Sequence, residues 1–161
     1  MNDYLMEKKI LMVCLGNICR SPLAQGIMEA KLRKYQIAAS VDSAGTLSYH
    51  AGHPPDERAV DIAKRYQVNI ASQVARKIAK SDYDQYDFIF TMDKSVYHSV
   101  FAAAPEKHNQ KVHLFLEYAG YNPGTEVPDP YYSDMEAFDK VFKLVDDACE
   151  KIVRKWYPNL K

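Results

Sequence analysis

Residues 8–22, "KKILMVCLGNICRSP", decide the fold of this chain. The first part, "KKILMVC", is almost continuously apolar, which is typical of a β-strand buried on both faces of a parallel sheet. A helix is expected to follow, with Ser21 as its N-cap and Pro22 at its first position, where the missing N–H costs nothing. The stretch therefore predicts a strand, a short loop and a helix, which together open a βαβ unit.

The same alternation of strand and helix patterns continues along the chain. Three further apolar runs predict strands: residues 38–45 "AASVDSAG", 86–93 "YDFIFTMD" and 111–115 "KVHLF". Helices are expected over residues 56–66 and in an apolar stripe that Asp93 caps and that stops before Pro105. Such alternation requires right-handed crossovers, and it predicts a parallel sheet with helices on both faces.

A long loop and a final helix complete the pattern. Residues 116–132 contain Gly and Pro and predict a loop, whereas residues 133–158 predict a helix with Ser133 and Glu136 as a capping box. No repeat or low-complexity tract divides the chain. We therefore expect one domain over residues 1–161, an α/β three-layer sandwich around a four-stranded parallel sheet. Ligands of such folds bind at the carboxyl ends of the strands, which is where Cys14 is expected.

The composition excludes several classes of partner. Lys and Arg together number 21, as do Asp and Glu, so the net charge is zero and predicts no binding to nucleic acid or acidic membranes. No apolar window approaches the length of a membrane span, so no membrane insertion is expected. Three cysteines in a chain without a secretory signal predict reduced thiols and a cytoplasmic protein.

The loop from Cys14 to Arg20 combines the features of an anion site with those of a reactive thiol. Unpaired N–H groups and the helix dipole gather there, Gly16 allows close approach, and Arg20 offers a fork for two phosphate oxygens. A helix N-terminus and a neighbouring arginine also lower the pKa of a thiol from about 8.5 to roughly 3.5–7.5, which favours a thiolate at neutral pH. The loop is therefore predicted to hold both a nucleophile and an oxyanion.

Other interpretations of this loop fit less well. A cysteine at the end of a strand is more often a packing residue. Here the strand, the glycine, the arginine and the Ser-Pro pair occur together, and this combination favours a catalytic cysteine. A Walker-type nucleotide loop would need Lys followed by Ser or Thr after a second glycine. No cofactor is expected. No metal is expected either, because the five histidines show no ligand spacing with each other or with the cysteines: His50, His53, His98, His108 and His113.

A thiolate that attacks a phosphate ester needs an acid to protonate the leaving alkoxide. In "VPDPYY", Asp129 lies between Pro128 and Pro130 in a restricted loop, and two tyrosines follow that could flank an aromatic substrate. Asp93 in "TMDKS" is the alternative acid, but its place before a helical stripe favours an N-cap. Asp129 is therefore the expected acid.

Four motifs together resemble the low-molecular-weight protein tyrosine phosphatases. They are "VCLGNICRSP", "DSAGT", "TMDKS" and "VPDPYY", in that order and at suitable spacing over essentially the whole chain. The resemblance implies a metal-free, two-step hydrolysis of phosphotyrosine and small aryl phosphates through a cysteinyl-phosphate. The implied partners are phosphotyrosine-containing proteins as substrates and inorganic phosphate as product.

The resemblance also implies a role for each matching residue. Cys14 is the expected nucleophile, and Arg20 binds the phosphoryl oxygens. Asp129 first protonates the leaving phenol and then activates water, while Ser21 stabilises the departing thiolate. Loop support is expected from Asn17 and Ser43. The expected substrate-binding residues are Leu15, Gly16, Asn17, Ile18, Cys19, Tyr49, Tyr131 and Tyr132.

Regulation is implied at the same site. By resemblance, Cys19 can form a reversible disulfide with the nucleophile, which fits the capture of a sulfenic acid by a nearby thiol. Tyr131 and Tyr132 are positions where family members can be phosphorylated. Two residues depart from the family pattern: Gln73 stands where a histidine often supports the loop asparagine, and Tyr49 stands where a tryptophan is common. The departures leave loop support and substrate preference open.

Two alternative functions remain open at this point. An arsenate reductase could use the same scaffold, although it needs further thiols, and Cys149 lies on the apolar stripe of the last helix. A non-catalytic phosphotyrosine or anion-binding module could keep the cradle, but it would need none of Cys14, Ser21 and Asp129. The chain is expected to be a monomer or to self-associate weakly.

Overall fold

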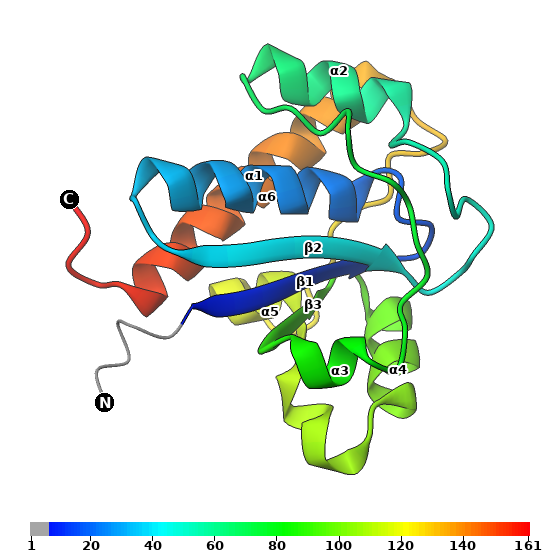
Figure 1. Ribbon diagram of the computed structural model, residues 1–161. Helices are drawn as coiled ribbons and strands as arrows, with labels where there is room; N and C mark the ends of the chain where they lie inside the picture. Colours follow the sequence, from blue (N-terminus) through cyan, green and yellow to red (C-terminus); the bar gives the residue numbers. More distant parts are fainter. Residues whose placement is uncertain (1–6) are drawn as a thin grey trace.

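The sheet of this protein has four parallel strands. The computed structural model describes residues 7–161, so residues 1–6 of the predicted domain lie outside the described residues. The strands are β1 (Lys8–Cys14), β2 (Ala39–Gly45), β3 (Phe88–Thr91) and β4 (Val112–Leu114), in the order β2-β1-β3-β4. Figure 1 labels the first three of these in that order. Every pairing between the four strands is parallel. The predicted four-stranded parallel sheet is confirmed.

Strand β1 is buried on both faces, because successive side chains of a strand point to opposite sides of a sheet. Ile10 and Met12 belong to one hydrophobic core, and Leu11 and Val13 belong to another. All four side chains are completely buried. The continuous apolar run of the sequence therefore corresponds to burial from both sides.

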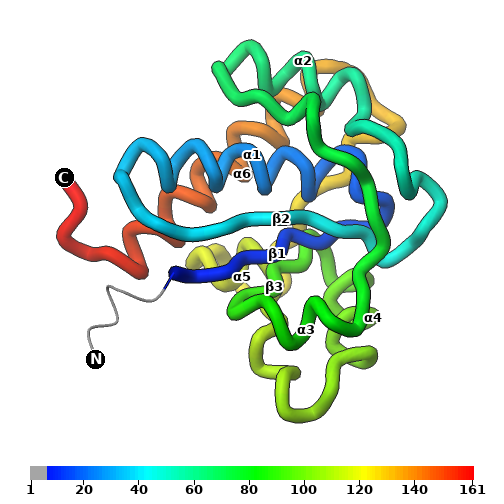
Figure 2. The backbone as a smooth tube through the Cα atoms, viewed as in Figure 1, coloured from blue at the N-terminus to red at the C-terminus, as the bar shows by residue number. Residues whose placement is uncertain are grey.

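Helices cover both faces of the sheet (Figures 1 and 2). On one face lie α1 (Arg20–Lys34), α2 (Glu57–Arg65), α5 (Phe115–Ala119) and α6 (Met135–Trp156), which contribute to the larger core. On the other face lie α3 (Asp82–Gln85), α4 (Lys94–Ala103) and a 3-10 helix, η2 (Glu106–Lys111). Helices α1 and α6 pack against each other. The predicted three-layer sandwich is confirmed.

The start of α1 differs from the expectation. The helix begins at Arg20 with Cys19 as its N-cap, so Ser21 and Pro22 both lie inside the first turn. The Leu23 N–H donates to the Cys19 carbonyl at 3.2 Å. Pro22 is tolerated at this place as well, because N–H groups of the first turn have no partner within the helix. The predicted cap at Ser21 is wrong, and its hydroxyl is used by the preceding loop instead.

Helix α5 lies where part of a long loop was expected. Phe115, Leu116 and Ala119 are buried at helical spacing, and this short apolar face packs into the larger core. Gly120 ends the helix with a φ of 110°, a left-handed conformation that glycine adopts at little cost. The prediction of a continuous loop over residues 116–132 is therefore wrong at its N-terminal end.

The caps of the later helices were predicted with mixed success. Asp93 caps α4 as expected, because its carboxylate accepts a hydrogen bond from the Val96 N–H at 2.8 Å. The N-cap of α6 is Asp134, which accepts from the Ala137 N–H at 3.1 Å. The predicted capping box that starts at Ser133 is therefore wrong by one residue, since an aspartate caps as well as a serine does.

The strand order reverses at β1. The chain passes from β1 to β2 on one side and later to β3 on the other, which leaves a crevice at the carboxyl end of β1. Cys14 is the last residue of this strand and pairs with Gly45 of β2. The fold therefore presents the thiol at the point where α/β proteins bind ligands.

Three further observations concern the part of the chain that the structure describes. No helix within residues 7–161 is long and apolar enough to cross a membrane. The same residues include no group of three or more His, Cys, Asp or Glu side chains placed to hold a metal ion. Cys14, Cys19 and Cys149 are all buried and free of disulfides.

Candidate active site

The loop between β1 and α1 starts at the thiol and ends at the arginine. Cys14 and Arg20 are both almost fully buried, with 3% and 4% of their surface exposed. Between them, Asn17 adopts a left-handed backbone conformation with a φ of 57°. This bend turns the Asn17 N–H toward the thiol, and it donates a hydrogen bond to Cys14 Sγ at 3.3 Å. The loop therefore curls around the sulfur.

A second donor reaches the sulfur from α1. Ser21 Oγ lies 2.9 Å from Cys14 Sγ, and it also accepts a hydrogen bond from Asn17 Nδ2 at 2.8 Å. Because that amide can only donate, the hydroxyl hydrogen of Ser21 stays free, and it donates to the sulfur when Cys14 is a thiolate, which has no hydrogen to give. Two donors thus converge on Cys14 Sγ, an arrangement that stabilises a thiolate.

Arg20 is held beneath the loop by two oxygens. Its Nη1 donates to Asp93 Oδ2 at 2.7 Å and to the Val127 carbonyl oxygen at 3.2 Å. Burial lowers the pKa of Arg20, but the negative charge of Cys14 and the hydrogen bond to Asp93 outweigh this and raise it above its ordinary value. The guanidinium is therefore a permanent cation with a fixed orientation.

The candidate acid, Asp129, lies close to Arg20. Asp129 Oδ2 is 3.7 Å from Arg20 Nη2, and the side chain of Asp129 is 45% exposed. Its other oxygen, Oδ1, accepts a hydrogen bond from the Tyr131 N–H at 3.1 Å. This carboxyl group is accessible from solvent and can exchange a proton with a molecule in the cleft.

These residues enclose a cleft of about 360 Å³. Tyr49 and Tyr132 stand at its rim, with 84% and 93% of their surface exposed. His50 packs edge-on against Tyr49 at 4.8 Å between ring centroids, a wall residue that the sequence analysis missed. The cleft is lined by Cys14, Leu15, Gly16, Ile18, Cys19, Arg20, Tyr49, His50, Asp129, Tyr131 and Tyr132.

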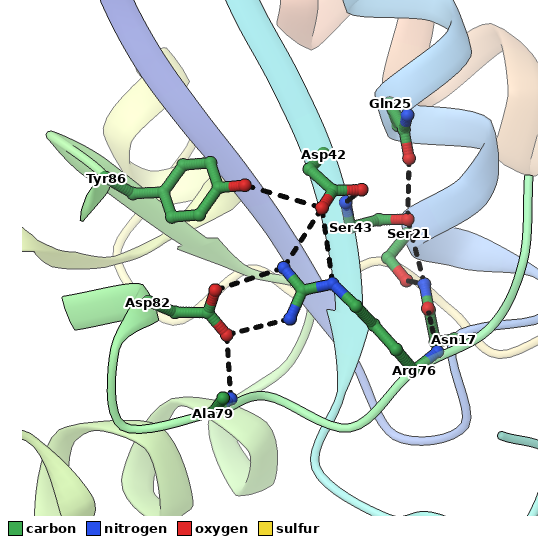
Figure 3. A network of polar contacts seen from close by, with 9 residues as sticks. All are labelled: Asn17, Ser21, Gln25, Asp42, Ser43, Arg76, Ala79, Asp82 and Tyr86. Atoms are coloured by element: carbon green, nitrogen blue, oxygen red, sulfur yellow. Dashed lines mark hydrogen bonds and ion pairs between the residues drawn. The ribbon is translucent and has the colours of Figure 1, made fainter. Parts of the chain in front are cut away.

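Three of the predicted site residues are buried and do not line the cleft: Asn17, Ser21 and Ser43. Figure 3 shows how they are connected. Asn17 Nδ2 donates to Ser43 Oγ at 2.9 Å, and Ser43 Oγ in turn donates to Gln25 Oε1 at 2.7 Å. Asn17 Oδ1 accepts from the backbone N–H of Arg76 at 3.0 Å. The amide of Asn17 is therefore satisfied on both sides.

Proteins of known family resemble this chain over most of its length. The family model for low molecular weight phosphotyrosine protein phosphatase matches residues 9–159. The chain belongs to this family.

Among its relatives are the low molecular weight phosphotyrosine protein phosphatases of Schizosaccharomyces pombe and Homo sapiens. The first is 37% identical, over 86% of this chain and 90% of the relative. The second is 34% identical, over 92% of this chain and 95% of the relative. A crystal structure of the protein tyrosine phosphatase from Entamoeba histolytica, with Hepes in its active site, has a TM-score of 0.89 and 36% identity. That match covers 94% of this chain and 98% of the other.

Gln73, one of the two departures from the pattern expected for this family, makes a contact of its own. Its Nε2 donates to the Pro22 carbonyl oxygen at 3.1 Å, so Gln73 braces the first turn of α1. The donor to Asn17 Oδ1 is the Arg76 backbone instead. The end of β2 also packs closely against the loop between β1 and α1. A Cβ at Gly45 would lie only 2.8 Å from the Leu15 carbonyl oxygen, so there is room only for glycine.

The loop that carries Asp129 is anchored by an arginine that the sequence analysis missed. Arg58 on α2 donates to the Tyr131 carbonyl oxygen at 2.8 Å and to the Ser133 carbonyl oxygen at 3.0 Å. Its guanidinium is itself held by Asp56, whose pKa is lowered by the hydrogen bonds from Arg58. The acid loop is therefore tied to the N-terminus of α2.

Cys19 is a second buried thiol at the start of α1. It has only 4% of its surface exposed, and it lines the same cleft. Burial and the negative charge of Asp56 raise the pKa of the Cys19 thiol well above its usual range. Cys19 is therefore held as the neutral thiol at physiological pH.

Proposed function

We propose that this protein hydrolyses phosphotyrosine in proteins, and small aryl phosphates, through a cysteinyl-phosphate on Cys14. The observation that carries the proposal is the convergence of three groups on one cleft. A sulfur with two hydrogen-bond donors lies beside the buried cation of Arg20, and the carboxyl of Asp129 stands 3.7 Å from that cation. A nucleophile, an anion holder and a proton donor are what phosphoryl transfer to a thiolate requires.

In the first step the Cys14 thiolate attacks phosphorus, and the bond between phosphorus and the phenolic oxygen breaks. The leaving phenolate takes the proton of Asp129, while Arg20 and the loop N–H groups bind the oxygens of the phosphoryl group. The guanidinium needs no large movement to do so, because Asp93 already holds one of its nitrogens.

In the second step Asp129 acts as a base. Its carboxylate takes a proton from water, the water oxygen attacks phosphorus, and the sulfur–phosphorus bond breaks. The products are inorganic phosphate and the Cys14 thiolate, which the Ser21 hydroxyl at 2.9 Å stabilises as it leaves. The cycle returns every group to its starting protonation state.

The cleft favours aromatic substrates. Tyr49, His50 and Tyr131 supply ring surfaces on which a planar phenyl group can stack. The half-exposed Leu15 adds an apolar contact at the rim. A phosphotyrosine residue projecting from a protein surface would reach the sulfur between these walls, so proteins carrying this modification are the proposed substrates.

The proposed function is tested by aryl phosphate hydrolysis in excess chelator. We expect metal-independent turnover, none with Cys14→Ser, and a loss of about 10²–10⁴-fold with Asp129→Ala. Asp61→Ala, at an exposed position on α2, is the matched control and should keep full activity. Turnover in Cys14→Ser, or a metal requirement, would refute the mechanism. Phosphate binding without turnover would favour a binding module, and thiol-dependent arsenate reduction would favour the reductase.

Cys19 is proposed as a redox guard of Cys14, and Tyr131 and Tyr132 as sites of phosphorylation. Both thiols line the cleft, and the Tyr132 ring is 93% exposed. After peroxide treatment we expect a disulfide between Cys14 and Cys19 by mass spectrometry. Recovery of activity on reduction should be poorer in Cys19→Ser, and equal recovery would count against the guard. We further propose a cytoplasmic protein that is monomeric or self-associates weakly.

A further inference from the structure

The side chain of Arg76 is clamped between two carboxylates (Figure 3). Its Nη1 and Nη2 donate to the two oxygens of Asp82 at 2.9 and 3.1 Å, a bidentate pair. Its Nε and Nη2 also donate to Asp42 Oδ2 at 3.2 and 3.1 Å. Asp82 has only 4% of its surface exposed and also accepts from the Ala79 N–H at 2.7 Å. Arg76 therefore links β2, which carries Asp42, to the start of α3, which carries Asp82.

The backbone of Arg76 holds the phosphate-binding loop. Its N–H donates to Asn17 Oδ1 at 3.0 Å, and its carbonyl oxygen accepts from the Gly45 N–H at 2.8 Å. Two residues on, the Ile78 N–H donates to the Gly45 carbonyl oxygen at 2.8 Å. Residues 75–78 thus run alongside the end of β2, but only an isolated bridge, outside the named strands, pairs them with the sheet.

The same segment also fixes one wall of the cleft. The Ala75 N–H donates to the His53 carbonyl oxygen, and its own carbonyl oxygen accepts from the Gly52 N–H, both at 2.8 Å. This pairing closes the loop that carries Tyr49 and His50. Residues 75–78 are therefore in contact with the phosphate loop on one side and with the substrate wall on the other.

Asn17 needs such a support. A left-handed backbone conformation costs a non-glycine residue free energy, so it persists only where neighbouring groups hold it. The partners of its side chain are Ser21, Ser43 and the Arg76 N–H. A continuous series of direct contacts leads from Asp82 through Arg76, Asn17 and Ser21 to Cys14 Sγ.

We propose that Arg76 is a positioning residue for the reaction given under Proposed function, on which this inference rests. Its guanidinium, fixed between Asp42 and Asp82, sets the place of its own backbone N–H, and that N–H keeps Asn17 in the conformation that directs two donors at the sulfur. Without the clamp, residues 75–78 would keep only backbone bonds at the edge of the sheet. The Arg76 N–H would then no longer be held at one place opposite Asn17 Oδ1, and the side-chain orientation of Asn17 would be less well fixed.

The test uses Arg76→Met, which keeps the length of the side chain and removes its donors. Arg76→Lys and Asp82→Asn are milder variants, because each keeps part of the clamp. Arg154→Met is the matched control, since Arg154 also contacts a carboxylate and a tyrosine hydroxyl but lies near the end of α6. Two readouts that need no turnover are the rate of Cys14 alkylation by iodoacetate and the protection that inorganic phosphate gives against it.

For Arg76→Met we expect Cys14 alkylation to slow, because the two donors are less well directed at its sulfur, and phosphate protection to need a roughly 3- to 30-fold higher concentration. Arg76→Lys should recover only part of the difference, since an ammonium group cannot bind both carboxylates as a fork. Arg154→Met should behave as wild type.

The proposal is overturned if Arg76→Met or the milder variants are folded, less stable to heat, and yet unchanged in alkylation and phosphate protection. In that case Arg76 would stabilise the fold without positioning the loop. Full rescue by Arg76→Lys would also contradict the proposal, because a positive charge without the fork of the guanidinium would then be enough to position the loop. A wild-type protein that binds phosphate but hydrolyses no aryl phosphate would refute the proposed function, while the two readouts would still decide the role of Arg76.

Discussion

Arg20 Nη1 lies 2.7 Å from Asp93 Oδ2, and the side chains of both residues are largely buried. The same carboxylate accepts from the Val96 N–H through its other oxygen and so caps α4. Asp93 therefore has two tasks, since it starts a helix on one face of the sheet and aims the phosphate-binding cation on the other. The two tasks can be separated by substitution.

Replacing Asp93 by serine should keep the cap and remove the ion pair. We expect kcat/KM for an aryl phosphate to fall about tenfold in Asp93→Ser, because the guanidinium loses the partner that fixes its plane. Asp93→Ala should lose the same activity and a further ~1 kcal/mol of unfolding free energy, measured in urea, because the helix also loses its cap. Wild-type kcat/KM in Asp93→Ser would show that Asp93 is not needed to orient the guanidinium of Arg20.

The dependence on the leaving group should identify Asp129 as the acid. In Asp129→Asn, kcat/KM should fall about 10²–10³-fold for a phosphotyrosine peptide, whose phenol needs a proton to leave. The loss should be much smaller for 4-nitrophenyl phosphate, because its leaving group departs as a stable anion. Equal losses with the two substrates would mean that Asp129 binds substrate and donates no proton.

Ser21→Ala should slow the breakdown of the intermediate more than its formation. The hydroxyl lies 2.9 Å from Cys14 Sγ, so its removal takes a donor from the sulfur when that sulfur leaves as a thiolate. We expect kcat to fall about 10²-fold, with a burst of phenol release in rapid-mixing experiments. Ser81→Ala, at an exposed position before α3, is the control. The absence of a burst, with kcat unchanged, would contradict this role.

Alkylation should distinguish the three thiols. Burial raises the pKa of Cys19 and of Cys149 well above the usual range, so both stay neutral as pH rises through the physiological range. A neutral thiol is a poor nucleophile, and we therefore expect iodoacetate near neutral pH to label Cys14 alone. Peptide mapping by mass spectrometry measures this directly. Comparable labelling of Cys19 would show that burial and Asp56 do not hold it as the neutral thiol.

The sequence was most informative where a local pattern has only one good structural solution. The apolar run before Cys14 predicted a strand buried on both faces, and the parallel topology then placed Cys14 at the crevice. Asp93 was predicted as an N-cap from the helical stripe behind it, and this was confirmed. Its second partner, Arg20, is 73 residues away and leaves no local signal.

Contacts between distant segments explain most of what was missed. Arg76 lies 59 residues from Asn17, in a segment with neither strand nor helix periodicity, and it contributes a backbone N–H that any residue would carry. Ser21 was misassigned as a cap, because the pattern before a helix does not reveal that a thiol and an amide compete for the hydroxyl. His50 belongs to the wall only because its loop folds back over Gly16.

The central claim is the covalent intermediate on Cys14, and trapping it is the most direct test. With Asp129→Ala and 4-nitrophenyl phosphate, the first step needs little acid while the second lacks its base, so the intermediate should accumulate. After rapid denaturation, mass spectrometry should find one phosphoryl group on the peptide that contains Cys14, and none in Cys14→Ser. A phosphoryl group on any other residue, or turnover that continues in Cys14→Ser, would contradict the account.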